Sequence, residues 1–126
     1  MTRTLIIIPT RMASTRFPGK PLIDIRGKTM IERVWECAVK AKVGDVYVAC
    51  CDAEVEAVLL QKKIKYILTK KKLKSGTDRV YDAYSKIKKR NDYKLVINLQ
   101  GDIPYFNHLY LRKLNNLAKV KKLHMA

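Results

Sequence analysis

The side chains that could do chemistry gather between Pro9 and Pro21, directly after the first apolar run of the chain. This segment holds three cations, Arg11, Arg16 and Lys20, together with three prolines and a single glycine. The prolines restrict the backbone, the glycine lets the backbone approach a ligand, and the cations can surround a polyanion with charge-assisted hydrogen bonds. The segment therefore fits a triphosphate, and a plain basic surface loop is the alternative. It matches neither the dinucleotide glycine fingerprint nor the Walker loop, because it lacks their glycines.

Two further loops carry polar groups suited to a nucleotide. Residues 75–79, Ser-Gly-Thr-Asp-Arg, form a predicted helix start, where free backbone N–H groups and the helix dipole favour an anion or the edge of a nucleotide. Ordinary N-capping by Ser75 is the alternative. Residues 100–104, Gln-Gly-Asp-Ile-Pro, put Asp102 where it can hold a hard divalent cation against phosphate oxygens. Its alternative role is to accept hydrogen bonds from the local backbone.

The remaining reactive side chains give no sign of a covalent mechanism. Neither His108 nor His124 stands in a recognisable motif with Ser or Cys, so phosphoryl or nucleotidyl transfer is the chemistry that is left. The three cysteines are Cys37, Cys50 and Cys51. Their odd number and the adjacent pair favour buried, reduced thiols over a disulfide framework or a zinc site.

The elements that must position these loops can be read from four short apolar runs, each followed by a segment with helical spacing. The runs lie at residues 5–8, 46–49, 66–68 and 95–99, and they are too short for helices, so we predict buried strands. Helices are predicted at residues 29–41, after Asp52, from residues 75–78 and from near Asn107. The helix at 29–41 has the clearest signal, because Thr29 and Glu32 form a capping box before an apolar face.

A strand followed by a helix, four times over, is typical of an α/β fold with a Rossmann-like, mostly parallel sheet and helices on both faces. Ligands of such sheets bind outside the carboxyl ends of the strands, so we expect the three loops to converge on one edge. A chain of 126 residues has room for one domain. Residues 121–126 fall where such a sheet would enter its next strand, which predicts an interrupted domain.

Positive charge is concentrated in the second half of the chain. Residues 61–126 hold 18 Lys and Arg against 4 Asp and Glu, whereas residues 1–60 hold 9 against 7. Most of these cations are lysines without interleaved aromatics, which favours a solvated surface over a nucleic-acid interface. The apolar stretch at residues 5–8 is too short for a membrane span or a signal peptide, so we expect a cytoplasmic protein.

Residues 6–22, 75–79 and 98–104, in this order and spacing, closely resemble the 3-deoxy-manno-octulosonate (Kdo) cytidylyltransferases, whose fold is of the nucleotide-diphospho-sugar transferase type. The resemblance implies that CTP and the acidic sugar Kdo are substrates, that CMP-Kdo and pyrophosphate are products, and that Mg²⁺ is the cofactor. It also implies a role in lipopolysaccharide assembly and a homodimer. A cytidylyltransferase for sialic acid and a non-enzymatic remnant or basic binding module are the alternatives.

By the same resemblance, Lys20 and Asp102 are the catalytic residues and Asp102 binds magnesium. The implied nucleotide-binding residues are Thr10, Arg11, Arg16, Lys20, Ser75, Gly76 and Gln100. Among them Arg11 and Lys20 hold the triphosphate, and Arg16 supports their loop.

Several positions depart from the pattern of the family. Thr10 stands in place of Ala, Ile103 in place of Glu, Leu73-Lys74 in place of His-Gln, and Cys50-Cys51 in place of Thr-Asp. Members of the family are also much longer, so residues 1–126 resemble the N-terminal, nucleotide-binding half of one domain. The other half would hold a second metal carboxylate, much of the sugar site and most of the dimer contact. We therefore expect CTP binding, with little activity from this chain alone.

Overall fold

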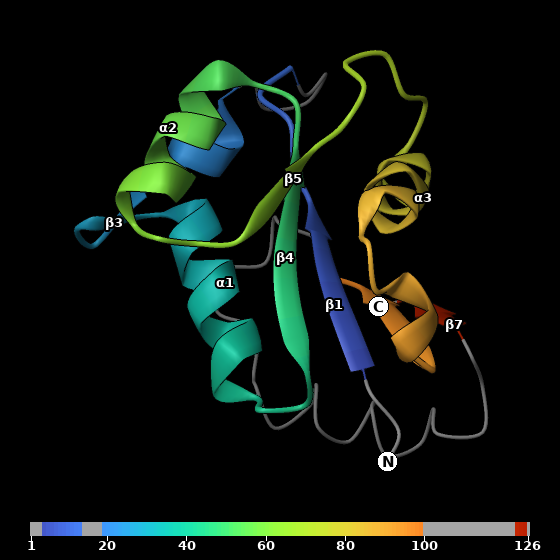
Figure 1. The fold of residues 1–126 in the computed structure, drawn as a ribbon. Helices are drawn as coiled ribbons and strands as arrows, with labels where there is room; N and C mark the ends of the chain where they lie inside the picture. The colour runs from blue at the N-terminus through green and yellow to red at the C-terminus, as the bar shows by residue number, and fades with distance from the viewer. Residues whose placement is uncertain (1–3, 14–18, 100–122, 126) are drawn as a thin grey trace.

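The computed structural model describes residues 4–13, 19–99 and 123–125. Its centre is a five-stranded sheet of order β5-β4-β1-β6-β7, in which all neighbouring strands are parallel (Figure 1). The strands are β1 (Thr4–Pro9), β4 (Asp45–Cys50), β5 (Tyr66–Leu68), β6 (Leu95–Asn98) and β7 (Leu123–Met125). The four predicted strands are thus confirmed. No strand was predicted at residues 121–126, but β7 lies there and pairs with β6.

In the part of the chain that the structure describes, three helices flank the sheet, and they cover both of its faces. They are α1 (Met30–Lys40), α2 (Ala53–Gln61) and α3 (Gly76–Lys86), with short 3-10 helices η1 (Lys20–Leu22) and η2 (Arg90–Asp92) between other elements. The helices α1 and α2 lie on one face and α3 lies on the other (Figure 1). The predicted arrangement is confirmed for these three helices, whereas the helix predicted from near Asn107 lies outside the described residues.

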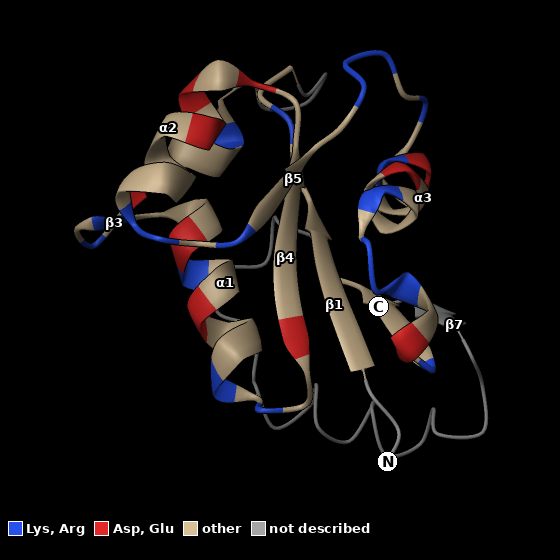
Figure 2. Ribbon diagram, viewed as in Figure 1, with Lys and Arg blue, Asp and Glu red and all other residues tan. Residues whose placement is uncertain are grey.

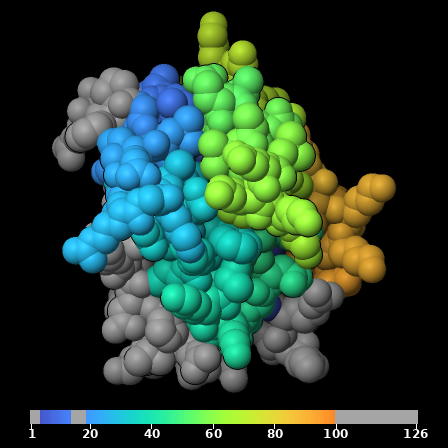
Figure 3. Space-filling model, turned by 90° about the vertical axis from the view of Figure 1, so that its left-hand side faces the viewer, coloured from blue at the N-terminus to red at the C-terminus, as the bar shows by residue number. Residues whose placement is uncertain are grey.

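The strand β1 shows why its sequence is a continuous apolar run. Ile6 and Ile8 point into the core beneath α1 and α2, whereas Leu5 and Ile7 point into the core beneath α3. All four side chains are fully buried, because successive residues of a strand face opposite sides of the sheet and both sides are covered. Figure 3 shows the outer surface of the α1 and α2 layer, where the two helices lie side by side.

The predicted capping box starts α1. The Thr29 hydroxyl accepts a hydrogen bond from the backbone N–H of Glu32, and the Glu32 carboxylate accepts one from the N–H of Thr29, each at 3.3 Å. A two-stranded hairpin that the sequence analysis missed comes just before it, formed by β2 (Asp24–Ile25) and β3 (Lys28–Thr29). Its turn residues, Arg26 and Gly27, both have positive φ, as a two-residue hairpin turn favours.

The lysines of the second half that the structure describes lie in solvent. Lys70, Lys71, Lys72 and Lys74 are exposed on the loop between β5 and α3, which Figure 2 shows as a mostly blue segment. All three cysteines are free thiols, and Cys37 and Cys50 are buried as expected. The expectation is wrong for Cys51, which is only partly buried. Among the described residues, no helix has the length and apolar character needed to cross a membrane.

Candidate functional site

The carboxyl edge of the sheet holds an open pocket of about 300 Å³. Its walls come from the segments that follow three neighbouring strands. Arg11 and Ala13 belong to the loop after β1, residues 51–54 lead from β4 into α2, and Lys71 belongs to the loop after β5. This is the edge at which the sequence predicted that ligand-binding loops would converge, because parallel strands bring their carboxyl ends together.

The loop after β1 is tied to the neighbouring strand and closed on itself. The backbone N–H of Thr10 donates to Ala49 O at 2.9 Å, and the N–H of Met12 donates to the Asp52 carboxylate at 2.8 Å. The loop closes where the N–H of Gly19 donates to Met12 O at 2.9 Å. Gly19 has φ of 80°, a left-handed conformation that glycine adopts without strain. The closure links the segment that carries Arg11 to the start of η1.

Thr10 has a hydroxyl whose hydrogen bonding is incomplete. Its side chain follows β1 directly and is only 7% exposed, and Oγ1 has no hydrogen-bond partner among the described residues. A buried hydroxyl normally has a partner, which can be a ligand or an ordered water molecule. Thr10 was predicted to bind the nucleotide, but its hydroxyl is buried and the residue is not part of the pocket wall.

The loop after β5 is held by Arg79, whose role the sequence analysis missed. This side chain is 2% exposed, and its guanidinium donates to Thr69 Oγ1 at 2.5 Å and to Lys70 O at 2.8 Å. A third, longer contact of 3.5 Å reaches Lys71 O. The available signal was its place in the predicted helix, since Arg79 shares the buried face of α3 with Val80 and Ala83.

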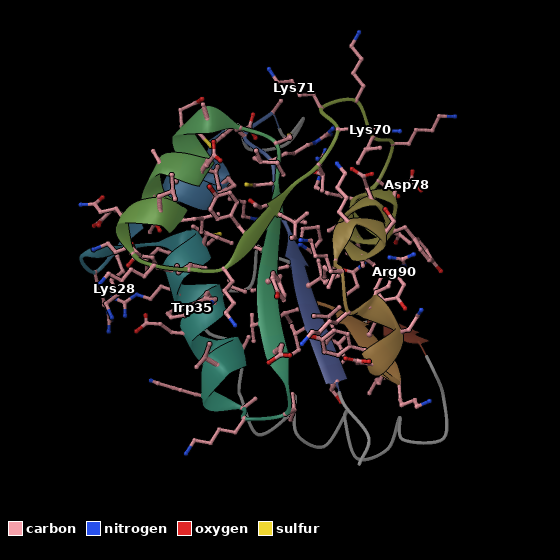
Figure 4. All side chains as sticks on the ribbon, in the orientation of Figure 1. Lys28, Trp35, Lys70, Lys71, Asp78 and Arg90 are labelled. Atoms are coloured by element: carbon pink, nitrogen blue, oxygen red, sulfur yellow. The ribbon has the colours of Figure 1, made fainter. Side chains whose placement is uncertain are left out.

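Asp82 fixes the same loop from the next turn of α3. Its carboxylate accepts the N–H of Lys70 at 2.9 Å and the ammonium of Lys86 at 3.2 Å. Burial acts to raise the pKa of Asp82, but these two donors outweigh it and the pKa lies below its ordinary value. With its backbone held in this way, the loop carries Lys71 over the carboxyl edge toward α2 (Figure 4).

Ser75 and Gly76 lie at the start of α3 and are not among the residues that line the pocket. The Ser75 hydroxyl accepts the N–H of Asp78 at 3.1 Å and thus caps the helix. Lys20 opens η1 and is half-buried, also outside the pocket wall. Of the predicted site residues, the pocket itself therefore includes Arg11. Arg16, Gln100 and Asp102 lie outside the described residues.

The two thiols beside the pocket stay protonated at neutral pH. Burial, with the nearby Glu56 carboxylate adding to it, raises the pKa of Cys50 to about 12. Burial also raises the pKa of Cys51, although the guanidinium of Arg79 opposes the shift. A thiolate is the reactive form of cysteine, so these residues do not supply a nucleophile.

A parallel α/β sheet with helices on both faces and a pocket at the carboxyl ends of its strands defines the Rossmann-like fold class. Comparison with known proteins then identifies the family. Residues 5–125 match the family described as Cytidylyltransferase, and the chain belongs to it.

Individual relatives carry a more specific name. The chain is 41% identical over 108 residues to a 3-deoxy-manno-octulosonate cytidylyltransferase of Parvibaculum lavamentivorans, covering 86% of this chain and 42% of the relative. It is 45% identical over 101 residues to the enzyme of the same name from a Chelativorans species, covering 80% and 40%. The chain thus spans less than half the length of these relatives.

Comparison with solved structures supports the fold described above. The structure of CMP:2-keto-3-deoxy-manno-octonic acid synthetase complexed with CTP superposes with a TM-score of 0.87 at 36% identity, covering 95% of this chain and 48% of that one. A cytidylyltransferase from Leptospira borgpetersenii superposes with a TM-score of 0.72 at 22% identity, covering 93% and 49%. The predicted fold class is confirmed.

Proposed function

We propose that the chain is the nucleotide-binding half of a CTP-dependent cytidylyltransferase, which transfers CMP from CTP to Kdo and releases pyrophosphate. The observation that carries the proposal is the likeness to a CMP-Kdo synthetase complexed with CTP, at 36% identity over nearly the whole chain. The names of the relatives support Kdo over sialic acid as the sugar. A cytoplasmic reaction in lipopolysaccharide assembly and a homodimeric enzyme complete the proposal.

The loop after β1 supports this function through its charge and its closure. Arg11 precedes Met12 and Lys20 follows Gly19, so the hydrogen bond between Gly19 N–H and Met12 O joins the two ends of the loop. Both cations then stand beside one closure, where they can bind different oxygens of a triphosphate. The start of α3, with Ser75 and Gly76, would offer its positive dipole end to the nucleotide.

Charge neutralisation is the main task of these residues. In the proposed reaction the anomeric hydroxyl of Kdo forms a bond to the α-phosphorus while the bond to the departing pyrophosphate breaks. Negative charge grows on the leaving group, and a fixed cation such as Lys20 stabilises it more in the transition state than in bound CTP. Such positioning supplies most of the rate enhancement in phosphoryl and nucleotidyl transfer.

Magnesium would be held by Asp102 together with phosphate oxygens. Among the described residues, no group of three His, Cys, Asp or Glu side chains could hold a metal by itself. Magnesium needs no such group, because it binds through one or two carboxylates when phosphates supply other oxygens. Bound there, the ion would neutralise charge on the phosphates.

Calorimetric titration of the 126-residue chain with CTP in magnesium tests the proposal. We expect binding that Arg11→Ala and Lys20→Ala each weaken by at least about tenfold, since each removes a charge-assisted hydrogen bond to phosphate. Lys40→Ala is the matched control, because Lys40 is an exposed cation that ends α1 before β4 begins. A folded wild-type chain that fails to bind CTP, or an equal loss in the control, would contradict the proposal.

Turnover needs its own measurement. The expected second metal carboxylate and much of the sugar site belong to the part of the relatives that this chain does not span. We therefore expect little release of pyrophosphate from CTP and Kdo with this chain alone. Release at a rate ordinary for an enzyme would show that the described half is sufficient.

A further inference from the structure

Asp52 uses its carboxylate in an unusual way for a residue that precedes a helix. It occupies the N-cap position of α2, where an aspartate normally accepts a hydrogen bond from its own helix, but it makes no such side-chain bond. Its Oδ2 instead accepts the backbone N–H of Met12 at 2.8 Å, across 40 residues of chain. The carboxylate is thus turned away from α2 and toward the loop after β1.

Met12 is the residue at which that loop closes. Its N–H is held by Asp52, and its carbonyl oxygen accepts the N–H of Gly19 at 2.9 Å. The residue before Met12 is Arg11 and the residue after Gly19 is Lys20. Asp52 therefore holds the peptide unit that follows Arg11, and Met12 in turn holds Gly19, the residue before Lys20.

We propose that Asp52 is a positioning residue for nucleotide binding: through Met12 it fixes the two ends of the loop after β1, at Met12 and Gly19, and so limits the positions that Arg11 and Lys20 can take when a triphosphate binds. The inference rests on the proposed function and assigns to it a residue beyond those predicted from the sequence. Its physical basis is preorganisation, because a loop that is ordered before binding loses less conformational freedom when the ligand arrives.

The charge of Asp52 makes the inference sharply testable. The carboxylate lines the same pocket as Arg11, so it repels a triphosphate bound there. If Asp52 acted only through its charge, Asp52→Ala would tighten CTP binding. If it acts by holding the loop, the same substitution weakens binding, and the two effects have opposite signs.

The chain offers two matched variants. Asp52→Asn removes the charge but keeps an oxygen that can accept the Met12 N–H. Glu54→Ala removes another carboxylate of the same pocket, one that makes no hydrogen bond among the described residues. Circular dichroism of each variant would establish that α2 is retained.

Calorimetry with CTP is the first measurement. We expect Asp52→Ala to weaken binding about tenfold, the scale of one lost charge-assisted hydrogen bond. Asp52→Asn should bind within about twofold of the wild type or more tightly, and Glu54→Ala should bind equally or more tightly, since both lose only a repelling charge. Equal or tighter binding by Asp52→Ala, or a tenfold loss in Glu54→Ala, would overturn the inference while leaving the proposed function intact.

Amide hydrogen exchange without nucleotide is the second measurement. The amides of Met12 and Gly19 should exchange at least about tenfold faster in Asp52→Ala and at nearly the wild-type rate in Asp52→Asn, because exchange requires their hydrogen bonds to open. Unchanged protection in Asp52→Ala would overturn the inference whether or not CTP binds. If the wild type binds no CTP, the proposed function fails, and the inference that depends on it is overturned as well, even if the loop loosens as expected.

Discussion

The two cationic loops that flank the pocket are held by anchors of opposite charge. The loop after β1 is tied by a carboxylate, Asp52, which accepts a backbone N–H. The loop after β5 is tied by a guanidinium, Arg79, which donates to backbone oxygens. Both anchors stand at the start of a helix rather than in the loop itself, Asp52 as the N-cap of α2 and Arg79 near the N-terminus of α3. Like charges within one segment repel each other. Contacts from a neighbouring element are therefore better suited to stabilise its conformation than contacts within the segment.

The anchors also differ in burial, and this difference separates their expected effects. Arg79 is 2% exposed and makes several contacts, so its loss leaves the buried Thr69 hydroxyl and the partly buried Lys70 carbonyl without this donor. Asp52 is partly buried and accepts the N–H of Met12 at the pocket. We therefore expect Arg79 to contribute mainly to folding stability and Asp52 mainly to ligand affinity.

The largest effect should follow substitution of Arg79. Arg79→Ala leaves Thr69 Oγ1 and Lys70 O without their donor, and we expect the free energy of unfolding to fall by about 2–3 kcal/mol. Urea denaturation measures the change. Arg79→Lys keeps the charge but not the planar guanidinium with its several donors, and it should lower the free energy of unfolding by less. A change in Arg79→Ala no larger than that of Asp52→Ala would remove the proposed difference between the anchors.

A smaller effect is expected at Lys71, the cation that the second loop carries to the pocket. Lys71→Ala should weaken CTP binding about threefold, because an exposed charge near a phosphate contributes modestly. The effect should shrink as salt is added. Lys72→Ala is the control, since Lys72 lies on the same loop but not among the pocket residues. An equal loss of CTP affinity in the two variants would indicate that the charge of the loop attracts CTP in general and that Lys71 makes no specific contribution at the pocket.

The smallest effect concerns pH and Asp82. Its pKa in the folded chain is lowered, so its contribution to stability is present above the unfolded pKa and is lost as the pH falls through the folded value. Asp82→Asn should therefore lower stability by about 0.5 kcal/mol at pH 7 and by less in acid. Urea denaturation at several pH values tests this. A difference between variant and wild type that grows toward low pH would contradict the expected sign.

The sequence was informative where one local rule decides the structure. The runs at residues 5–8 and 46–49 are apolar throughout because both faces of the sheet are covered, and this pattern is typical of buried parallel strands. The capping box at Thr29 and Glu32 depends on residues three apart. Such signals predicted the layers of the fold and the edge at which the pocket lies.

The anchors could not be predicted in the same way. The hydrogen bond from the Met12 N–H to Asp52 joins residues 40 apart in the sequence. Any other backbone N–H could serve as the donor equally well, so the sequence does not single out Met12. Arginine side chains are usually exposed, so the residue type gave no reason to predict that Arg79 is buried. The hairpin at Asp24–Thr29 has strands of two residues, which are too short to show periodicity. Cys51 lines the pocket because β4 ends just before it, at Cys50. Its residue type alone had favoured a buried position in the core.

The central place of β1 has a consequence for how the chain reaches its native state. The strand β1 pairs with β4 on one side and with β6 on the other, so Leu5 lies opposite Asp45 and Val96, and both neighbours follow β1 in the sequence. Neither edge of β1 can be completed until its distant neighbour has been synthesised, and closing such long loops is slow. During that interval the four large aliphatic side chains of β1, at residues 5–8, cannot be buried in the sheet. A nascent chain of this topology should therefore depend on chaperones more than one whose early strands pair locally.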